Sequence, residues 1–252
     1  MSQVIALGID IGGSGIKAAP VNLLDGSLTQ ERLRMETPQP AQPETMLAAV
    51  EQLVSAFSWQ GPIGCTFPGI IRNGITCSAA NVAAQWIGHP TEAVLTEMLG
   101  QPVHLLNDAD AAGLAEMRFG AAGEHQGTIL MLTLGTGLGS ALFINGTLVP
   151  NTEFGHLLMH GDSAERYMTN SARKREGLSW AEWAARINEY LTMTDHLLSP
   201  DLYILGGGVS KKHQKFLPML AANAPILPAK LRNRAGIVGA AIYAGEMISR
   251  AA

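Results

Sequence analysis

Residues 105–116, which read LLNDADAAGLAE, join a predicted strand to a predicted helix. The residues before this stretch form a short apolar run typical of a buried strand, and those after it are strong helix formers. Asn107 and Asp108 are therefore expected at the carboxyl end of a strand, where ligands bind in open α/β sheets. There the Asp108 carboxylate could accept a proton from a substrate hydroxyl. Alternatively, Asp108 or Asp110 only caps the helix.

Outward from this stretch, two segments of the chain share one plan of strand, glycine turn and strand. The first is predicted over residues 4–22 around the turn GGSG, and the second over residues 128–144 around the turn GTGLGS. Further predicted strands alternate with helices, which places the chain in the α/β class. A third glycine run, Gly206-Gly207-Gly208, follows another predicted strand.

The two glycine turns are suited to hold a phosphate chain. Glycines let the backbone approach an anion closely, and the amide groups of a tight turn donate to its oxygens. Asp10 adds a carboxylate suited to Mg²⁺, and Lys17 adds a positive charge for phosphate. Thr136 and Ser140 add hydroxyls to the second turn. Neither turn has the sequence of a nucleotide P-loop or the G-x-G-x-x-G pattern, so the signal lies in the repetition of the context.

Glu153 and His156 form the next polar cluster. Because these two residues are three apart in the sequence with a glycine between them, both side chains could contact the hydroxyls of one sugar. Alternatively, His156 is a core histidine whose ring nitrogens are satisfied. His156 and His160 are four residues apart, but no Cys and no clear acidic third ligand supports a metal site there.

The C-terminal part of the chain is expected to alternate loops and helices. Residues 150–176 are polar and are predicted to be partly loop. Ser179, with Glu182 three residues later, predicts a helix that begins with a capping box. A further helix is expected from about Ser210, and a helix of small residues over 235–250 ends the chain.

The composition is that of an enzyme-sized soluble protein. The chain has 252 residues, 47% hydrophobic and 15% charged, and its formal net charge of -4 gives no indication of a nucleic-acid partner. Residues 1–165 carry 5 Lys+Arg against 15 Asp+Glu, whereas residues 166–252 carry 12 against 6. The basic C-terminal part could attract an anionic substrate, although solvated helix faces often carry such charge.

The cysteines and the hydropathy indicate the compartment. Cys65 and Cys77 lack metal-type spacing, and neither a signal peptide nor an apolar stretch of membrane-spanning length is present. We therefore expect a reduced, cytoplasmic protein without a membrane partner.

Several motifs in chain order resemble the ROK family, which comprises repressors, uncharacterised frames and sugar kinases. They are DIGGSGIK at 10–17, LNDA at 106–109, LGTGLGS at 134–140 and EFGH at 153–156. Longer stretches are most similar to the polyphosphate glucokinases of that family: NDADAAGLAEMRFG at 107–120, TLGTGLGSALF at 133–143, LVPNTEFGH at 148–156, SPDLYILGGGVS at 199–210 and AGIVGA at 235–240. The resemblance covers essentially the whole chain.

The resemblance implies a fold and an assembly. The fold is the α/β, two-lobed actin-like ATPase (ribonuclease H-like) fold of the ROK sugar kinases, usually as a homodimer. The lobes are expected at residues 1–106 and 107–252, with the final helix, about 236–250, packing back on the first lobe.

The resemblance also implies roles for single residues. Asp108 is the catalytic base that takes the proton of the glucose 6-hydroxyl. The sugar is bound by Asn81, Asn107, Glu153, His156 and Glu165 and by the backbone of Pro68 and Gly69. The phosphoryl donor, polyphosphate and/or ATP with Mg²⁺ at Asp10, is bound by Asp10, Gly12, Gly13, Ser14, Gly15, Lys17, Gly135, Thr136, Gly137, Gly139, Gly206, Gly207 and Gly208.

This sequence departs from the family pattern in two places. ROK kinases commonly carry a cysteine-rich zinc motif after the Glu-x-Gly-His element, but residues 157–175 contain no Cys, so no zinc is expected. Many relatives also carry acidic and basic residues just before the tryptophan, where residues 81–86 read NVAAQW. The second departure bears on donor preference and sugar selectivity.

A long polyanionic donor would need a basic track beyond the reacting phosphate. The candidates, each of which could also be an ordinary solvated face, are Lys174 and Arg175; Lys211, Lys212 and Lys215; and Lys230, Arg232 and Arg234.

Other functions remain open. The chain could be a strictly ATP-dependent ROK glucokinase, or a kinase of another hexose such as mannose or a 2-amino sugar. A ROK repressor needs a DNA-binding segment ahead of the first strand, which is predicted to begin at about Val4, so no nucleic-acid partner is expected. A non-catalytic actin-like ATPase would not need the sugar cluster of Asn107, Glu153 and His156.

Overall fold

The computed structural model describes residues 4–79 and 82–251. The chain separates into two compact units: unit 1 comprises Met1–Ala115 and Arg234–Ala252, and unit 2 comprises Glu116–Asn233. The sequence places a boundary between residues 106 and 107, at a junction of strand and helix. The division falls instead within helix α3 (Asp108–Phe119), because this helix continues from one unit into the other. Each unit is described by itself below.

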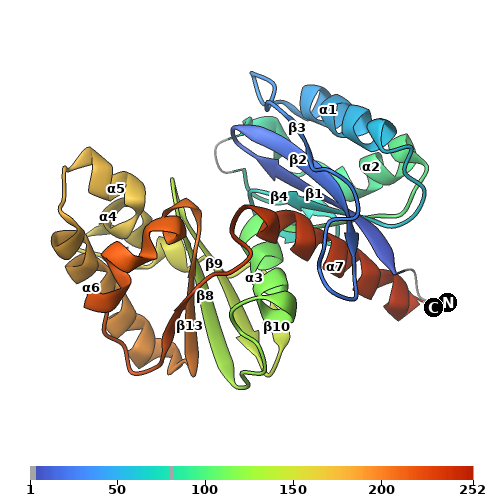
Figure 1. Ribbon diagram of the computed structural model, residues 1–252. Helices are drawn as coiled ribbons and strands as arrows, with labels where there is room; N and C mark the ends of the chain where they lie inside the picture. The colour runs from blue at the N-terminus through green and yellow to red at the C-terminus, as the bar shows by residue number, and fades with distance from the viewer. Residues whose placement is uncertain (1–3, 80–81, 252) are drawn as a thin grey trace. The chain divides into compact units, whose positions relative to one another are not determined.

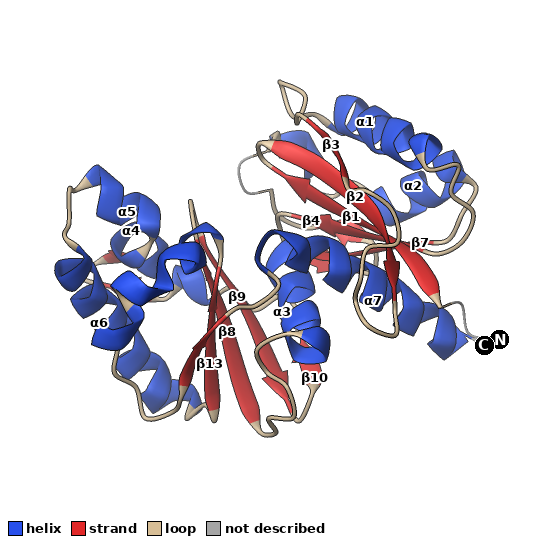
Figure 2. Ribbon diagram, in the orientation of Figure 1, coloured by secondary structure: helices blue, strands red, loops and turns tan. Residues whose placement is uncertain are grey.

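The sheet of unit 1 has the strand order β3-β2-β1-β4-β7 (Figures 1 and 2). Its strands are β1 (Ile5–Gly12), β2 (Gly15–Asn22), β3 (Leu33–Met35), β4 (Ile63–Phe67) and β7 (Val103–Asn107). β1, β2 and β3 are antiparallel neighbours, which confirms the first hairpin, whereas β1, β4 and β7 run parallel. The carboxyl ends of these three parallel strands therefore meet at one edge of the sheet.

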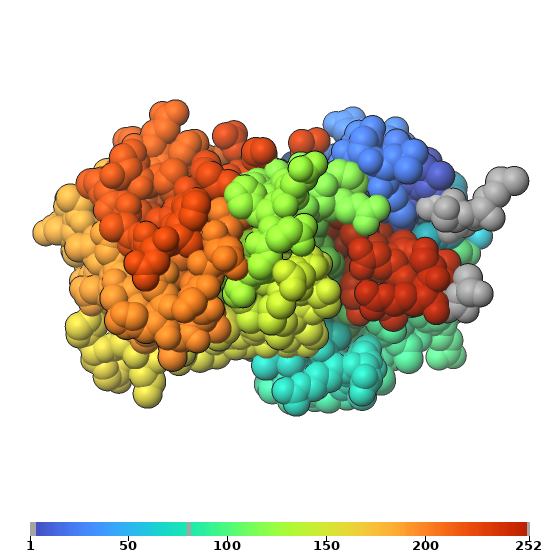
Figure 3. All heavy atoms as spheres, turned by 90° about the horizontal axis from the view of Figure 1, so that it is seen from below, coloured from blue at the N-terminus to red at the C-terminus, as the bar shows by residue number. Residues whose placement is uncertain are grey.

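Helices cover both faces of this sheet. α1 (Pro43–Ala56) and α2 (Thr91–Leu99) lie on one face and α7 (Ala235–Ala251) on the other (Figure 1). A Cβ added to Gly8 of β1 would lie 1.9 Å from the Ile237 carbonyl oxygen, so the backbone of α7 rests directly on the strand. The outer side of α7 lies at the surface, in red in Figure 3.

The core of unit 1 lies between the sheet and α1. Leu7, Ile9 and Ile11 alternate along β1 and pack with Met46 and Val50 of α1, and all five side chains are fully buried. Removing this apolar surface from water stabilises the unit. Beside the sheet, β5 (Ile71–Arg72) and β6 (Ile75–Thr76) form a small hairpin that is followed by the 3-10 helix η1 (Ala84–Trp86).

Unit 2 contains a sheet with a matching plan. Its strand order is β10-β9-β8-β13-β14, with antiparallel neighbours β10, β9 and β8 and parallel neighbours β8, β13 and β14. The bounds are β8 (Thr128–Leu134), β9 (Leu138–Ile144), β10 (Thr147–Val149), β13 (Leu202–Gly206) and β14 (Ile226–Pro228). Both units thus join three antiparallel strands to two parallel ones in the same order.

The long helix α6 (Trp180–Leu198) covers one face of this sheet. Its buried side chains, among them Trp183, Ile187 and Tyr190, pack against Leu130 and Leu132 of β8. The predicted capping box is confirmed: the Ser179 hydroxyl accepts from the Glu182 N–H, and the Glu182 carboxylate accepts from the Ser179 N–H.

One expectation for unit 2 is confirmed and another needs correction. The stretch 150–176 is partly loop, and between its loops lie the short elements η2 (Phe154–His156), β11 (Leu158–Met159), β12 (Asp162–Ser163), α4 (Ala164–Met168) and α5 (Asn170–Arg175). The helix expected from Ser210 is the 3-10 helix η3 (Gly208–Lys215), in which the Ser210 N–H donates to the Gly207 carbonyl oxygen three residues back. A second 3-10 turn, η4 (Leu217–Met219), follows, and η5 (Arg232–Arg234) precedes α7. Among the described residues, the helices are too short or too polar to cross a bilayer.

Candidate active site

In unit 1, Asp10 lies at the centre of three neighbouring strands. The strand register pairs it with Lys17 of β2 on one side and Thr66 of β4 on the other. Lys17 Nζ lies 2.8 Å from Asp10 Oδ2, and the Thr66 hydroxyl donates to Asp10 Oδ1 at 3.2 Å. The predicted carboxylate and lysine are therefore together, next to a threonine that the sequence reading did not select.

The first glycine turn is held from outside while its tip is open. Arg34 Nη2 donates to the Ser14 carbonyl oxygen at 3.0 Å, and the Thr37 hydroxyl donates to the Gly12 carbonyl oxygen. Gly13 and Ser14 are exposed. The supports therefore come from residues 34 and 37, and the tip of the turn is accessible to an anion.

Asn107, rather than an aspartate, caps helix α3. Its Oδ1 accepts from the N–H groups of Ala109 (2.8 Å) and Asp110 (3.0 Å), the pattern of an N-cap. The neighbouring Asp108 is exposed, and its Oδ1 accepts from the Ala109 N–H at 2.9 Å. With the cap supplied by Asn107, the carboxylate of Asp108 stands at the carboxyl end of β7, on the surface of unit 1.

Asn107 also fixes the loop after β4. Its Nδ2 donates to the Gly69 carbonyl oxygen at 3.1 Å, and a Cβ added to Gly69 would lie 2.4 Å from the Ser78 carbonyl oxygen. The predicted backbone site at Pro68 and Gly69 is thus packed beside the end of β7 in unit 1. Asn81, the remaining predicted sugar ligand from this half of the chain, lies outside the described residues.

In unit 2, the second glycine turn is closed by its own backbone and held by Glu165. The Gly135 N–H donates to the Gly137 carbonyl oxygen at 3.0 Å, and the Leu138 N–H donates to Glu165 Oε2 at 3.1 Å. A Cβ added to Gly137 would lie 2.7 Å from the same oxygen, so a side chain there would displace Glu165. Thr136 at the tip is exposed.

Glu153, His156 and Glu165 interact electrostatically in this unit. Burial raises the pKa of Glu153; the positive potential of His156 opposes this shift and the charge of Glu165 adds to it. The three predicted sugar-binding side chains of unit 2 are therefore brought together. His156 is exposed on η2. Gly155, which lies between Glu153 and His156 in the sequence, packs against β9, where an added Cβ would be 2.5 Å from the Leu138 carbonyl oxygen.

Ser140 does not have the role considered from the sequence. Ser140 is buried; its hydroxyl donates to the Thr152 carbonyl oxygen at 2.6 Å and accepts from the Phe154 N–H at 3.1 Å. It therefore shapes the loop around Glu153 rather than offering a hydroxyl to the donor. His160 Nε2 lies 2.7 Å from Glu189 Oε2 of α6.

Gly207 packs against the end of β8. It has φ +80°, and an added Cβ would lie 2.5 Å from the Leu134 carbonyl oxygen. Leu134 precedes the second glycine turn, so the second and third glycine segments are neighbours within unit 2. Gly208, which follows, is exposed.

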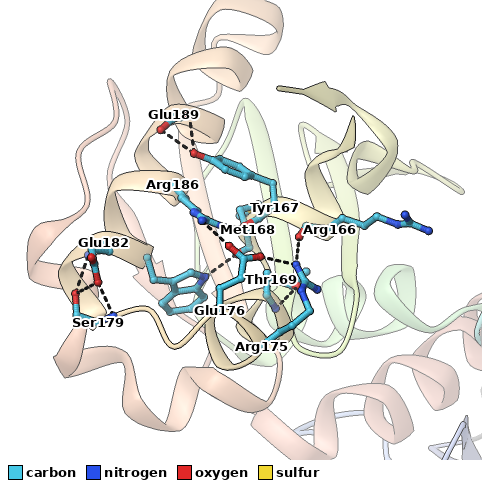
Figure 4. Close-up of polar contacts among 12 residues, drawn as sticks. Arg166, Tyr167, Met168, Thr169, Arg175, Glu176, Ser179, Glu182, Arg186 and Glu189 are labelled. Atoms are coloured by element: carbon cyan, nitrogen blue, oxygen red, sulfur yellow. Dashed lines mark hydrogen bonds and ion pairs between the residues drawn. The ribbon is translucent and has the colours of Figure 1, made fainter. Parts of the chain in front are cut away.

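A charged network fastens the segment that carries Glu165 to α6 (Figure 4). Glu176 lies between two arginines, with 2.6 Å to Arg175 Nη2 and 2.6 Å to Arg186 Nη2. Arg186 also donates to the Tyr167 carbonyl oxygen and lies over the Tyr167 ring, whose hydroxyl donates to Glu189. The two arginines lower the pKa of Glu176.

Residues 6–172 match the model of the ROK family. The chain belongs to the ROK family. It is 45% identical to the polyphosphate glucokinase of Mycobacterium tuberculosis over 242 residues, covering 96% of this chain and 91% of that one. The polyphosphate glucokinase of Mycobacterium leprae is 44% identical, over 93% of this chain and 73% of its own length.

Solved ROK structures resemble the whole chain. The inorganic polyphosphate/ATP-glucomannokinase of Arthrobacter sp. strain KM superposes with a TM-score of 0.92 at 48% identity, covering 97% of this chain and all (100%) of that one. A ROK glucokinase of Streptomyces griseus, solved with glucose and AMPPNP, gives a TM-score of 0.80 at 24% identity, over 96% and 99%. The fold is the two-lobed actin-like ATPase fold of the ROK sugar kinases, as the sequence predicts.

Proposed function

We propose that this protein transfers the terminal phosphoryl group of inorganic polyphosphate or ATP to the 6-hydroxyl of glucose. The relatives at 44–48% identity are polyphosphate glucokinases and a polyphosphate/ATP-glucomannokinase. The observation in the chain itself that carries the proposal is the division of labour between Asn107, which caps α3, and Asp108, whose carboxylate stands exposed at the end of β7.

In the proposed reaction, Asp108 acts as the general base. The glucose O6 attacks the terminal phosphorus of the donor and forms a new O–P bond while the hydroxyl proton passes to the Asp108 carboxylate. The bond from that phosphorus to its bridging oxygen breaks, and its electron pair leaves with the shortened polyphosphate or ADP. Catalysis then depends mainly on positioning and on neutralising the oxygens of the transferred group.

The sugar is proposed to be held by Asn107, Glu153, His156 and Glu165, by Asn81, and by the backbone at Pro68 and Gly69. Support comes from each unit separately: Asn107 is bonded to Gly69, and Glu153, His156 and Glu165 influence one another. Burial raises the pKa of Glu153, and its carboxylate oxygens can accept hydrogen bonds from sugar hydroxyls.

The donor is proposed to bind the glycine segments. These are the first turn with Gly12, Gly13, Ser14, Gly15 and Lys17, the second with Gly135, Thr136, Gly137 and Gly139, and the run Gly206, Gly207 and Gly208. The exposed tips at Gly13, Ser14 and Thr136 support this assignment. Lys17 would exchange part of its contact with Asp10 for a donor phosphate.

Mg²⁺ fits this site as a metal held chiefly by the donor. Among the described residues, no three His, Cys, Asp or Glu side chains are grouped as a protein cage for a metal would require. Both Asp10 oxygens already accept, from Lys17 and Thr66, so this carboxylate fits contact with the metal's water ligands. When bound, Mg²⁺ neutralises the phosphate oxygens of the donor.

Mannose is a second candidate acceptor. The specific observation is the 48% identity to a glucomannokinase. We further propose a homodimer, which the resemblance to ROK sugar kinases supports. We also propose a cytoplasmic location, which is supported by Cys65 and Cys77, since both lie among the described residues and are free thiols.

The first experiment is to measure glucose 6-phosphate and mannose 6-phosphate formation by the purified protein with Mg²⁺. The donors to compare are ATP and nucleotide-free polyphosphate. Turnover of polyphosphate supports the proposed donor, and turnover of ATP alone restricts the protein to an ATP-dependent glucokinase. No sugar phosphate with either donor contradicts the proposed function.

A further inference from the structure

The lysines of η3 follow directly on the third glycine segment. Lys211, Lys212 and Lys215 are exposed and lie on η3, which begins at Gly208, directly after Gly207. The Ser210 hydroxyl donates to the Gly207 carbonyl oxygen at 2.8 Å, which fixes the first turn of η3 to the glycine run. Because Gly207 packs against Leu134, η3 begins beside the second glycine turn.

Helix α5 adjoins the same turn. The N–H and hydroxyl of Ser171 both donate to the Gly135 carbonyl oxygen at 3.3 Å. Two residues on, the Arg173 guanidinium lies 4.2 Å from the centre of a Trp180 ring. Lys215 Nζ lies 5.7 Å from the centre of a ring of the same indole. A cation from α5 and a cation from η3 therefore meet at one tryptophan.

The positive charge along η3 is not compensated. Residues 202–245 contain six Lys or Arg and no Asp or Glu. Within the described ranges 4–79 and 82–251, Lys211, Lys212 and Lys215 make no ion pair with a carboxylate.

The arginines of the Figure 4 network are different in this respect. Arg175 and Arg186 share Glu176, and Arg166 lies 3.7 Å from Asp162. Carboxylates that neutralise a cation reduce its attraction for a polyanion. Of the basic clusters in the sequence, the one on α5 is therefore weakened by Glu176, whereas the one on η3 keeps its charge.

The segment around Lys230 is bound to helix α3 rather than to the glycine segments. The N–H groups of Lys230 and Leu231 donate to the carboxylate of Glu116, at 3.0 Å and 2.7 Å. This places the segment at the C-terminal end of α3, and Arg234 belongs to unit 1. Lys230 and Arg232 therefore offer a charge-matched comparison with Lys211 and Lys212: both pairs are exposed, belong to unit 2 and lie in the acid-free stretch.

We infer that Lys211, Lys212 and Lys215, together with Arg173 across Trp180, bind the phosphate groups of polyphosphate beyond the group that is transferred. The inference rests on the proposed function and names the donor subsite within it. Polyphosphate carries charge along its whole length, so it gains from cations that extend past the glycine turns. ATP confines its charge to three phosphates and depends on these lysines less.

The test compares two double variants, Lys211→Gln/Lys212→Gln and the control Lys230→Gln/Arg232→Gln. KM and kcat are measured with long-chain polyphosphate, tripolyphosphate and ATP over a series of salt concentrations. For the η3 variant we expect KM for long-chain polyphosphate to rise about three- to tenfold. We also expect the negative slope of log(kcat/KM) against log[salt] to become shallower by about 1 for each lysine replaced. The change with tripolyphosphate and ATP is expected to be smaller, and the control variant is expected to behave as the unaltered protein.

Three results would overturn the inference. One is an equal rise in KM for all donors, which would assign the lysines to the reacting phosphates. Another is an equal loss in the control variant, which would reduce the effect to net charge. The third is an unchanged salt slope. Failure of the unaltered protein to use any polyphosphate is distinguishable from these, because it would overturn the proposed donor itself.

Discussion

The carboxylate of Glu165 accepts a hydrogen bond from the backbone N–H of Leu138 at 3.1 Å. The contact attaches α4 to the second glycine turn, and the same oxygen lies 2.7 Å from where a Gly137 Cβ would stand. Burial raises the pKa of Glu153, and the charge of Glu165 adds to this shift. One carboxylate thus links the segment proposed for the donor with the cluster proposed for the sugar.

Glu165 can be tested by two substitutions of different severity. Glu165→Ala removes the acceptor for the Leu138 N–H, and we expect KM to rise for both glucose and the donor. Glu165→Gln keeps an oxygen acceptor for Leu138 but loses the charge, so KM for the donor should return toward the wild-type value while KM for glucose stays high. Steady-state kinetics with each substrate varied in turn provide the measurement. If Gln restores both constants, Glu165 acts on the turn alone.

Asp108→Asn should lower kcat about 10²–10⁴-fold, because the amide cannot take the proton of the glucose hydroxyl. The fold should be retained, since an amide oxygen still accepts from the Ala109 N–H. The measurement is kcat at saturating glucose and ATP, with thermal unfolding as the check on folding. Asp25→Asn is the matched control: Asp25 is an exposed aspartate that accepts from the Ser27 N–H in a turn of unit 1. Near-normal turnover by Asp108→Asn would exclude it as the base.

Substitutions at Asn107, unlike Asp108→Asn, should lower the stability of the fold as well as the activity. Asn107→Ala removes the acceptor of the α3 cap and the donor to the Gly69 carbonyl oxygen, and the cap alone contributes about 1 kcal/mol. Asn107→Asp keeps the cap acceptor and lacks only the donor. We expect its unfolding midpoint in urea to lie between those of the wild type and Asn107→Ala, with a raised KM for glucose. Equal midpoints for the two variants would mean that the cap contributes nothing.

The sequence predicts the features that depend on neighbours along the chain. The strand over residues 128–134, the capping box of Ser179 and Glu182, and the first hairpin are all confirmed. Each follows from a period, a cap or a turn that is complete within about twenty residues. From the sequence Asp10 and Lys17 have separate roles, and their contact is a consequence of the hairpin, which places them opposite each other.

Contacts between segments that are distant in the sequence are not predicted by such local patterns. Thr66 reaches Asp10 only through the parallel register of β1 and β4, which hydrophobic pattern does not specify. The position of Ser140 in the sequence predicts a place in the donor turn, but the pleat of β9 directs its side chain inward to Thr152. The order in residues 150–176 arises from contacts of Tyr167 and Glu176 with α6, which a polar composition does not reveal.

Glu153 predicts a pH dependence of stability with a definite sign. Burial raises its pKa above the ordinary 4.5, so between that value and the higher folded-state pKa the folded protein binds more protons than the unfolded chain. Stability conferred by this group therefore falls as pH rises through that window, and the loss persists at higher pH.

Glu153→Gln removes the titration. We expect the difference in unfolding free energy, variant minus wild type, to be more positive at about pH 7 than at about pH 4. Urea unfolding at both pH values measures it, with Glu124→Gln as the control for replacing an exposed glutamate. A difference that does not change with pH, or that changes in the opposite direction, would contradict a raised pKa at Glu153, whatever the variant does to glucose binding.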